Sequence, residues 1–467
     1  MYPLDSLGLG RFRSFIVLFY FFAITVVGLS SIWGFFSYYV FRIVHSQTKI
    51  YLLPFFTASG FVIAEYLRSW AYGILWYGSK GTLGPHWTFG NPAYLFLDFY
   101  HLMVTASFWG IYGIDFIGVF FITSLVLLIL IKPLKTIFVY WILSSLLLVW
   151  VLNAMKPLAN VSYQPLPIAI IQTQSGTALK QSDQEIISDF NKKIGLLKSS
   201  AKEVDGGIVV LPEGNDFSNT LRRFLDSGSV ETFFNNLSKS ETLIIDHVRA
   251  KGVNDIIKST SLFINSKNGL VGSSDKKVLT PAGEYLPFLM GWLPMFLPAE
   301  SEQSFTSSRE FSKGTNFESL FFNNLNIKTV VCSEIFSPNL LKNDYGLIVG
   351  QGSLGIFRGS EILEWELVSA LRLRAIENNK PAVLALNYGH SYVINPRGEV
   401  EKRTDSLGYQ MLTATIVPNE TRTWYNKLGD LPILLLSLAV FGTGFMYIKP
   451  SILDLFYKSR LRNKKSL

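Results

Sequence analysis

Three residues that could together perform covalent acyl transfer each lie at the end of a predicted strand. Cys332, the only cysteine in the 467-residue chain, follows the β-branched run 329–331, which is typical of a buried strand. Glu213 follows the apolar run 208–211, and Lys276 closes another extended segment. Open α/β sheets place their chemistry at such strand ends. A cysteine thiolate attacks carbonyls, a buried carboxylate can take the thiol proton, and a lysine can stabilise the resulting oxyanion.

Taken alone, each of these residues has a simpler structural interpretation. A single buried cysteine is usually a small core residue. A Pro-Glu pair after a strand is usually a turn, and Lys276 beside Lys277 is usually a solvated edge. The combination of the three residue types is more specific than any one of them. It predicts a cysteine nucleophile with a glutamate base and a lysine partner.

The sequence makes no comparable case for a metal or cofactor site. The five histidines are scattered along the chain and do not have the spacing of metal ligands. They are His45, His86, His101, His247 and His390. The Gly-Gln-Gly stretch at 350–352 is too weak a signal for a phosphate-binding loop. We therefore expect neither a metal nor a cofactor.

The composition is that of a membrane protein with one extramembrane domain. Hydrophobic residues make up 49% of the chain and aromatic residues 15%, while only 16% are charged, against about 25% in typical globular chains. Charges are sparse before residue 155 and ordinary from 180 to 430. The net charge of +8 does not indicate nucleic acid, because much of the basic excess flanks hydrophobic segments, where it reports topology. One cysteine excludes an intrachain disulfide.

Hydrophobic runs predict an N-terminal transmembrane domain at residues 1–156, with about four to five spans. A helix of about 20 apolar residues crosses a bilayer. The runs of suitable length cover 14–41, 50–70, 111–131 and 136–152. The first run is either one long tilted helix or, less favourably, a hairpin that turns at residues 28–31.

Two features near the second run also carry expectations. Glu65 and Arg68 are three residues apart, so they can pair on one helix face near the interface. The aromatic and glycine-rich stretch 73–110, which includes Trp76, is interpreted as a belt at the membrane–water interface. The alternative is a lid or a wall for lipid access.

The rest of the chain predicts an α/β domain at 160–425, because strand and helix patterns alternate there, among them a strand at 242–246 and a helix at about 361–378. A last apolar run predicts a transmembrane helix at 429–448, followed by a basic tail at 449–467. Basic residues mark the cytoplasmic side of membrane proteins. We therefore expect the tail in the cytoplasm and the α/β domain on the opposite side. Four N-terminal spans then place the arginine-bearing N-terminus outside, an exception that splitting the first run would remove.

These motifs resemble those of the apolipoprotein N-acyltransferases in the nitrilase (carbon-nitrogen hydrolase) superfamily. Members show Pro-Glu after a strand, then Lys-x-x-Leu-Val-Pro-Phe-Gly-Glu, then Cys-Tyr-Glu. This chain has Pro-Glu ending at Glu213, and Lys276 stands eight residues before Glu284, which fixes the register of the lysine motif. Cys332-Ser333-Glu334 matches the nucleophile motif. The resemblance to this family extends over about residues 50 to 448.

The resemblance implies an αββα sandwich beside a multi-span helical domain. It implies Glu213, Lys276 and Cys332 as the catalytic residues, with Glu284 orienting the lysine and the base, and with Glu334 in support. Two departures stand out: Ser333 replaces the tyrosine of the family, and 350–353 reads Gly-Gln-Gly-Ser where Ser-Asn-Asp is usual.

The implied activity moves a fatty acyl chain from a phospholipid, through a thioester, to the N-terminal amine of diacylglyceryl-cysteine in an apolipoprotein. The implied setting is the bacterial inner membrane, with the catalytic domain on the periplasmic side and the protein acting as a monomer. Two alternatives stay open. One is a membrane-tethered amidase that uses water as the acceptor, and the other is a non-catalytic homologue whose site has decayed.

The apolar stretch 288–297 follows Glu284, and its prolines and glycine make it a poor helix or strand. It is either a loop packed on its own core or an arm that dips into the bilayer and admits acyl chains. Soluble domains seldom expose such a run. We expect Trp292 and Phe296 of this stretch, together with Trp76, to line the lipid access route.

Overall fold

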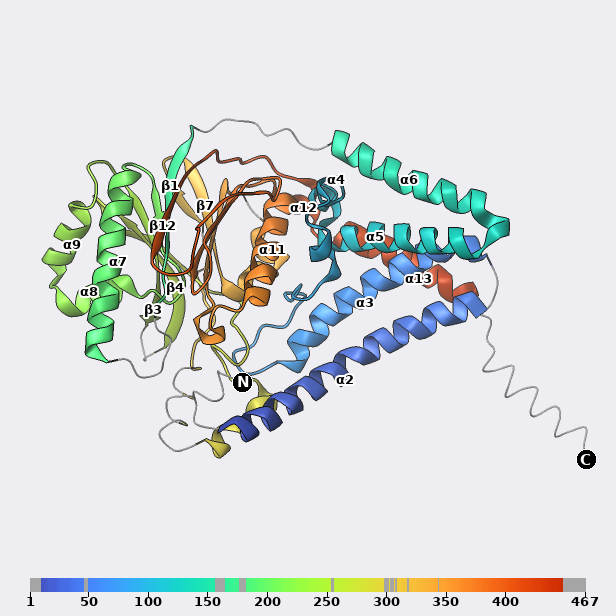
Figure 1. Ribbon diagram of the computed structural model, residues 1–467, viewed down its shortest axis with the longest axis horizontal. Coiled ribbons are helices and arrows are strands. Elements are labelled where there is room, and N and C mark those ends of the chain that lie inside the picture. Colours follow the sequence, from blue (N-terminus) through green and yellow to red (C-terminus); the bar gives the residue numbers. More distant parts are fainter. Residues whose placement is uncertain are drawn as a thin grey trace, which may run out of the picture.

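The computed structural model places a bundle of long helices beside a two-sheet sandwich (Figure 1). It describes residues 10–45, 49–155, 164–175, 182–252, 256–297, 302, 306, 309–316, 319–342 and 344–447. The connection between the fourth run and the sandwich, and the predicted basic tail, lie outside the described residues. The long helices are α2 (Gly10–His45), α3 (Leu53–Leu75), α5 (Ala106–Leu130), α6 (Lys135–Ala154) and α13 (Leu431–Tyr447).

Four helical stretches of the described chain are long and apolar enough to cross a membrane. They are Gly10–Val44, Ile50–Leu75, Ala106–Leu130 and Lys132–Ala154. The fifth helix of the bundle, α13, is apolar but shorter, with 17 residues. Each hydrophobic run of the sequence is therefore a helix. The stretch 73–110 is partly folded, with a 3-10 turn at Pro92–Phe96 and the short helix α4 (Tyr100–Met103).

The first hydrophobic run is one helix, so the alternative of a hairpin is wrong. The Ser30 and Ser31 hydroxyls turn back onto the helix and donate to the carbonyls of Val27 and Gly28, at 3.2 and 2.9 Å. This satisfies the polar side chains that suggested a turn. The 36 residues of α2 span about 54 Å at 1.5 Å per residue, well beyond a bilayer core of about 30 Å.

The N-terminal half of α2 packs against the apolar stretch 288–297. Val17 and Phe21 share an apolar cluster with Met290 and Leu293. The first turns of α2 therefore lie on the sandwich side of the bundle (Figure 1). This is the arrangement that four N-terminal spans require.

The sandwich consists of two six-stranded mixed sheets. One sheet has the order β12-β1-β2-β3-β4-β5, and the other has the order β11-β10-β9-β8-β7-β6. The first contains β1 (Leu166–Gln172), β2 (Ile208–Val210), β3 (Leu243–Lys251), β4 (Ile257–Asn265), β5 (Gly269–Asp275) and β12 (Gln410–Ile416). The second contains β6 (Leu320–Phe322), β7 (Leu325–Val331), β8 (Leu347–Ser353), β9 (Ala382–Asn387), β10 (Tyr392–Ile394) and β11 (Val400–Arg403).

Apolar side chains on both faces of each sheet explain the four layers. Alternate strand residues such as Ile170 and Val210 meet Val349 and Val383 between the sheets. The other face of the first sheet packs on α7 (Asp183–Glu203), α8 (Phe217–Phe224) and α9 (Ser227–Asn235). The other face of the second sheet packs on α11 (Glu361–Asn378). This αββα sandwich beside an apolar helical bundle confirms the predicted fold class.

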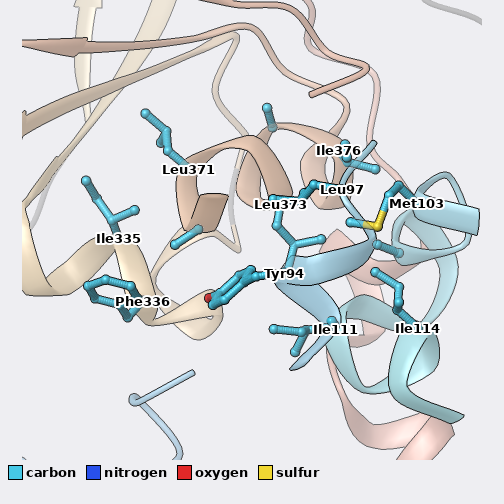
Figure 2. Close-up of a cluster of buried hydrophobic side chains, with 14 of the residues drawn as sticks. Tyr94, Leu97, Met103, Ile111, Ile114, Ile335, Phe336, Leu371, Leu373 and Ile376 are labelled. Atoms are coloured by element: carbon cyan, nitrogen blue, oxygen red, sulfur yellow. The ribbon is translucent and has the colours of Figure 1, made fainter. Parts of the chain in front are cut away.

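Helix α11 also joins the sandwich to the bundle. One buried cluster contains Leu371 and Leu373 of α11, Ile111 and Ile114 of α5, and Phe336 after β7 (Figure 2). A buried hydrogen bond of 3.1 Å runs from the backbone N–H of Ile111 to Glu377 Oε1. The two parts therefore share a single apolar core.

Several elements differ from the sequence prediction. Helices α8 and α9 and strands β6, β11 and β12 were not predicted, and β3 extends to Lys251 rather than ending at Asp246. Every residue of β11 is exposed, so no alternation of apolar residues marks it. The extra residues of β3 pair with β4 across its full length, a contact between strands that a local pattern does not show.

Gly110 provides a test of the junction between bundle and sandwich. Its φ of 65° lies in the left-handed region, and an added Cβ would lie 2.2 Å from the ring of Tyr425. Left-handed backbone costs other residues about 1–2 kcal/mol, and overpacking adds about 1–3 kcal/mol. We expect Gly110→Ala to lower the midpoint of thermal unfolding in detergent. Gly118→Ala on the same helix meets only ordinary contacts, and equal midpoints for the two variants would contradict this account.

Candidate active site

The candidate nucleophile opens a tight turn at the end of a buried strand. β7 ends at Val331, and Cys332 begins the 3-10 turn Cys332–Phe336 with a φ of 49°. A non-glycine residue in this region is uncommon, and such strain gathers at functional sites. The side chain is partly accessible. The turn therefore presents a thiol at the strand end, as the sequence predicted.

The structure brings the three predicted catalytic residues and Glu284 together. Lys276 Nζ lies 3.3 Å from Glu213 Oε1 and 2.9 Å from Glu284 Oε2. The thiol of Cys332 lies close enough to the Glu213 carboxylate for the two groups to shift each other's pKa. The Lys276 side chain is completely buried, whereas 15% of the Glu213 side chain is exposed. A substrate can therefore reach the thiol and the carboxylate, while the lysine lies beneath them.

Burial and charge shift the proton affinities of these groups in ways that suit a base and a nucleophile. Burial raises the pKa of Glu213 above its usual value, although attraction to Lys276 opposes the shift. Burial also raises the pKa of the Cys332 thiol, with Glu213 adding to the effect. Burial alone would lower the pKa of Lys276, but attraction to Glu284 and Glu213 outweighs it and raises that pKa. The site thus combines a permanent ammonium, a protonated thiol and a carboxylate of increased basicity.

Glu334 ties the nucleophile turn to the segment that carries Lys276. Its Oε2 accepts the backbone N–H of Val331 at 3.1 Å. Its Oε1 accepts the N–H groups of Lys277 and Val278 at 2.7 and 3.2 Å. Among the described residues Glu334 forms no ion pair with Lys276, and its hydrogen bonds link the two loops.

Two residues for which the sequence gave no role complete this link. Thr280 accepts a 3.3 Å hydrogen bond from Lys276 Nζ and donates its backbone N–H to Glu284 Oε2 at 2.7 Å. Ser333, which departs from the family pattern, receives a hydrogen bond from Thr280 Oγ1 and donates to the carbonyl of Val278, both at 3.0 Å. The hydroxyl of Ser333 thus bonds the lysine loop.

The second departure, at 350–353, forms part of strand β8. Gln351 is fully buried there. Its Nε2 donates to the carbonyl of Leu211 and its Oε1 accepts from Ser261 Oγ, both at 2.6 Å. Gln351 therefore links the two sheets below the turn that bears Glu213. Among the described residues, no group of histidine, cysteine, aspartate and glutamate could hold a metal ion.

The residues expected at the lipid access route lie against α2. The ring of Phe21 lies 6.0 Å from Trp292 and 5.4 Å from Trp76. Tyr285, just before the stretch, donates from its Oη to the carbonyl of Trp76 at the end of α3, at 2.9 Å. As predicted, 288–297 forms only short 3-10 turns, Phe288–Met290 and Leu293–Phe296. The side chain of Phe296 lies outside the described part of the chain.

Comparison with known proteins identifies the family of this chain. Residues 168–426 match the carbon-nitrogen hydrolase family, and the chain belongs to that family. Among solved structures it is similar to Saccharomyces cerevisiae Nit3, a member of the nitrilase superfamily, with 18% identity, a TM-score of 0.40, and coverage of 56% of this chain and 93% of that one.

The curated relatives confirm the more specific resemblance, to apolipoprotein N-acyltransferases. The chain is 28% identical to the Aquifex aeolicus protein of that name over 296 residues, which are 63% of each chain. It is 24% identical to the Haemophilus ducreyi protein of that name over 412 residues, 84% of this chain and 75% of the relative. The match thus spans less than two thirds of the Aquifex protein.

The pH dependence of Cys332 alkylation tests Glu213 as the base. A base works only when ionised, so the iodoacetamide rate should fall as the pH drops through the pKa of Glu213, which is raised above its usual value of 4.5. Glu213→Gln should abolish this limb and slow alkylation about 10²-fold or more, as the loss of a general base does. Glu185→Gln on the exposed start of α7 is the matched control. A native profile in Glu213→Gln would show that the base is another group.

Proposed function

We propose that this chain is an apolipoprotein N-acyltransferase, a membrane enzyme that transfers a fatty acyl chain from a phospholipid to an apolipoprotein. The observation that carries the proposal is the contact of Lys276 with Glu213 and Glu284 beside Cys332. The curated relatives support the class of reaction. The shared core with the helical bundle supports a site that works on substrates anchored in lipid.

In the first half-reaction, Glu213 takes the thiol proton while the sulfur of Cys332 attacks the carbonyl carbon of a phospholipid ester. The ammonium of Lys276 stabilises the oxyanion that forms. As the intermediate collapses, the ester C–O bond breaks, and Glu213 returns the proton to the oxygen of the departing lysophospholipid. The acyl chain stays on Cys332 as a thioester.

In the second half-reaction, the N-terminal amine of a diacylglyceryl-cysteine attacks the thioester carbon. Glu213 accepts a proton from the amine, the C–S bond breaks, and the proton passes to the sulfur of Cys332. An amide forms and the free thiol returns. Lys276 serves both halves, because its raised pKa keeps it charged throughout.

The stretch 288–297, here called the apolar arm, is proposed to admit the acyl chains. The backbone N–H of Phe288 donates to the carbonyl of Tyr77 at 2.9 Å, and Trp292 packs on α2. Phe288 and Met295 are 67% and 74% exposed. The arm begins four residues after Glu284, which contacts Lys276, so it connects the membrane helices with the site. Flexible methionine and aromatic side chains suit acyl chains of varied shape.

The proposal places the protein in the bacterial inner membrane with its catalytic domain on the periplasmic side. The basic residues after α13 support a cytoplasmic tail. The packing of the N-terminal half of α2 on the apolar arm supports a start of α2 on the same side as the catalytic domain. The enzyme is proposed to act as a monomer.

Acyl transfer from labelled phospholipid to a diacylated lipopeptide tests the proposed reaction. Cys332→Ala should abolish transfer, and Lys276→Ala should slow it by about 10²-fold or more, the typical loss for one oxyanion donor. Lys277→Ala removes a neighbouring lysine whose ammonium, among the described contacts, forms no ion pair with Glu213 or Glu284, and it should change the rate little. Transfer by Cys332→Ala would refute the mechanism. Release of ammonia from amides without transfer would indicate an amidase instead.

The apolar arm is tested by comparing two acyl donors. Phe288→Ser with Met295→Ser should slow Cys332 acylation by phospholipid vesicles far more than acylation by a short-chain soluble ester, because only the vesicle reaction needs lipid access. Phe321→Ser changes an equally exposed phenylalanine on β6, 68% exposed, and should affect neither donor. Equal losses on both donors would show that the arm only packs.

A further inference from the structure

His247 on β3 lies next to the turn that carries Glu213. The side chain is buried, with 3% exposed. Its Nδ1 accepts the backbone N–H of Gly214 at 3.0 Å, and its carbonyl accepts the N–H of Asp216 at 2.9 Å. Gly214 directly follows Glu213 and has a φ of 70°. His247 therefore holds the peptide beside the proposed base.

The other side of the ring points to the lysine. His247 Nε2 lies 2.8 Å from Ser259 Oγ on β4. The carbonyl of Ser259 accepts the backbone N–H of Lys276 at 2.7 Å. A chain of contacts thus leads from Gly214 through one imidazole to the main chain of Lys276. Glu213 and Lys276 are therefore linked twice, once through His247 and once by their direct ion pair.

The hydrogen bonds of His247 define the tautomer of its ring. A backbone N–H can only donate, so Nδ1 of His247 carries no proton, and Nε2–H donates to Ser259. Burial, together with the nearby charges of Lys276 and Arg249, lowers the pKa of His247 to about 3. The ring therefore stays neutral and keeps one fixed tautomer at neutral pH. It exchanges no proton with the thiol.

We propose that His247 is a positioning residue for acyl transfer, which sets the separation of the Glu213 and Lys276 main chains without touching substrate. The proposal rests on the proposed function of the site. Sequence motifs did not indicate it, since His247 lies in none of them. A misplacement of about 1 Å can cost about 10²-fold in rate.

A second anchor explains why loss of His247 should displace the turn rather than unfold it. The neighbouring Asp246 accepts the backbone N–H of Ser218 at 2.7 Å and the side-chain amide of Asn215 at 3.4 Å. These bonds hold the far end of the same turn. The contact at Gly214 adds the restraint nearest to Glu213.

The test uses two amides that each replace one ring nitrogen. The Oδ1 of asparagine takes the place of Nδ1 and can still accept from Gly214, whereas the longer glutamine replaces Nε2 and reaches Ser259. We expect His247→Asn to keep most of the activity. His247→Gln and His247→Leu should lower kcat about 10²-fold, with KM for the lipopeptide nearly unchanged, because no substrate contact is lost.

Iodoacetamide alkylation of Cys332 separates this proposal from the proposed function. It needs no acyl donor or acceptor, so the same ranking, Asn above Gln and Leu, is expected even if the natural substrate differs. Val248→Ala, which removes buried packing on the same strand, should lower the thermal midpoint without changing either rate. Equal rates for the Asn and Gln variants, or losses that only follow the thermal midpoint, would overturn the proposal.

Discussion

The structure around the site depends on one buried cation. The side chain of Lys276 is fully buried and is balanced by Glu213 and Glu284. Removing one partner of a buried ion pair typically costs about 3–5 kcal/mol, because it leaves an uncompensated charge. Both carboxylates must therefore stay within contact distance. Glu334, Thr280 and His247 each fix a loop that carries one of these groups, so the support of the site follows from the cost of burying the ammonium.

The membrane helices also help to hold the site in place. The nucleophile turn ends at Phe336, which lies in one apolar core with α5 and α11 (Figure 2). The hydroxyl of Thr88, in the loop after α3, donates to the carbonyl of Phe336 at 2.6 Å. That loop is held in turn by Arg68, which pairs with Glu65 at 2.7 Å as predicted and donates to the carbonyl of Phe89. The turn that bears Cys332 is thus fixed from both the sandwich and the bundle.

The sequence predicted those elements of the fold and residues of the site that a local sequence pattern marks. Helix α11 was predicted at about 361–378, and it begins and ends there. Glu213, Lys276 and Cys332 were found from their motifs, and the structure places them together. His247 and Gln351 were not found, since their contacts join strands far apart in sequence. The hairpin in α2 was a wrong alternative, because serine hydroxyls bonded within a helix resemble a polar turn in sequence.

The central claim is that Cys332 carries the acyl chain as a thioester. Intact-protein mass spectrometry after incubation with phospholipid vesicles, and without any acceptor, tests it most directly. The account predicts a mass gain of one fatty acyl group on Cys332. Neutral hydroxylamine should remove the acyl group from Cys332. A diacylated lipopeptide should also remove it and should gain the same acyl group. Acyl transfer without any adduct on Cys332, or with the adduct on another residue, would contradict the account.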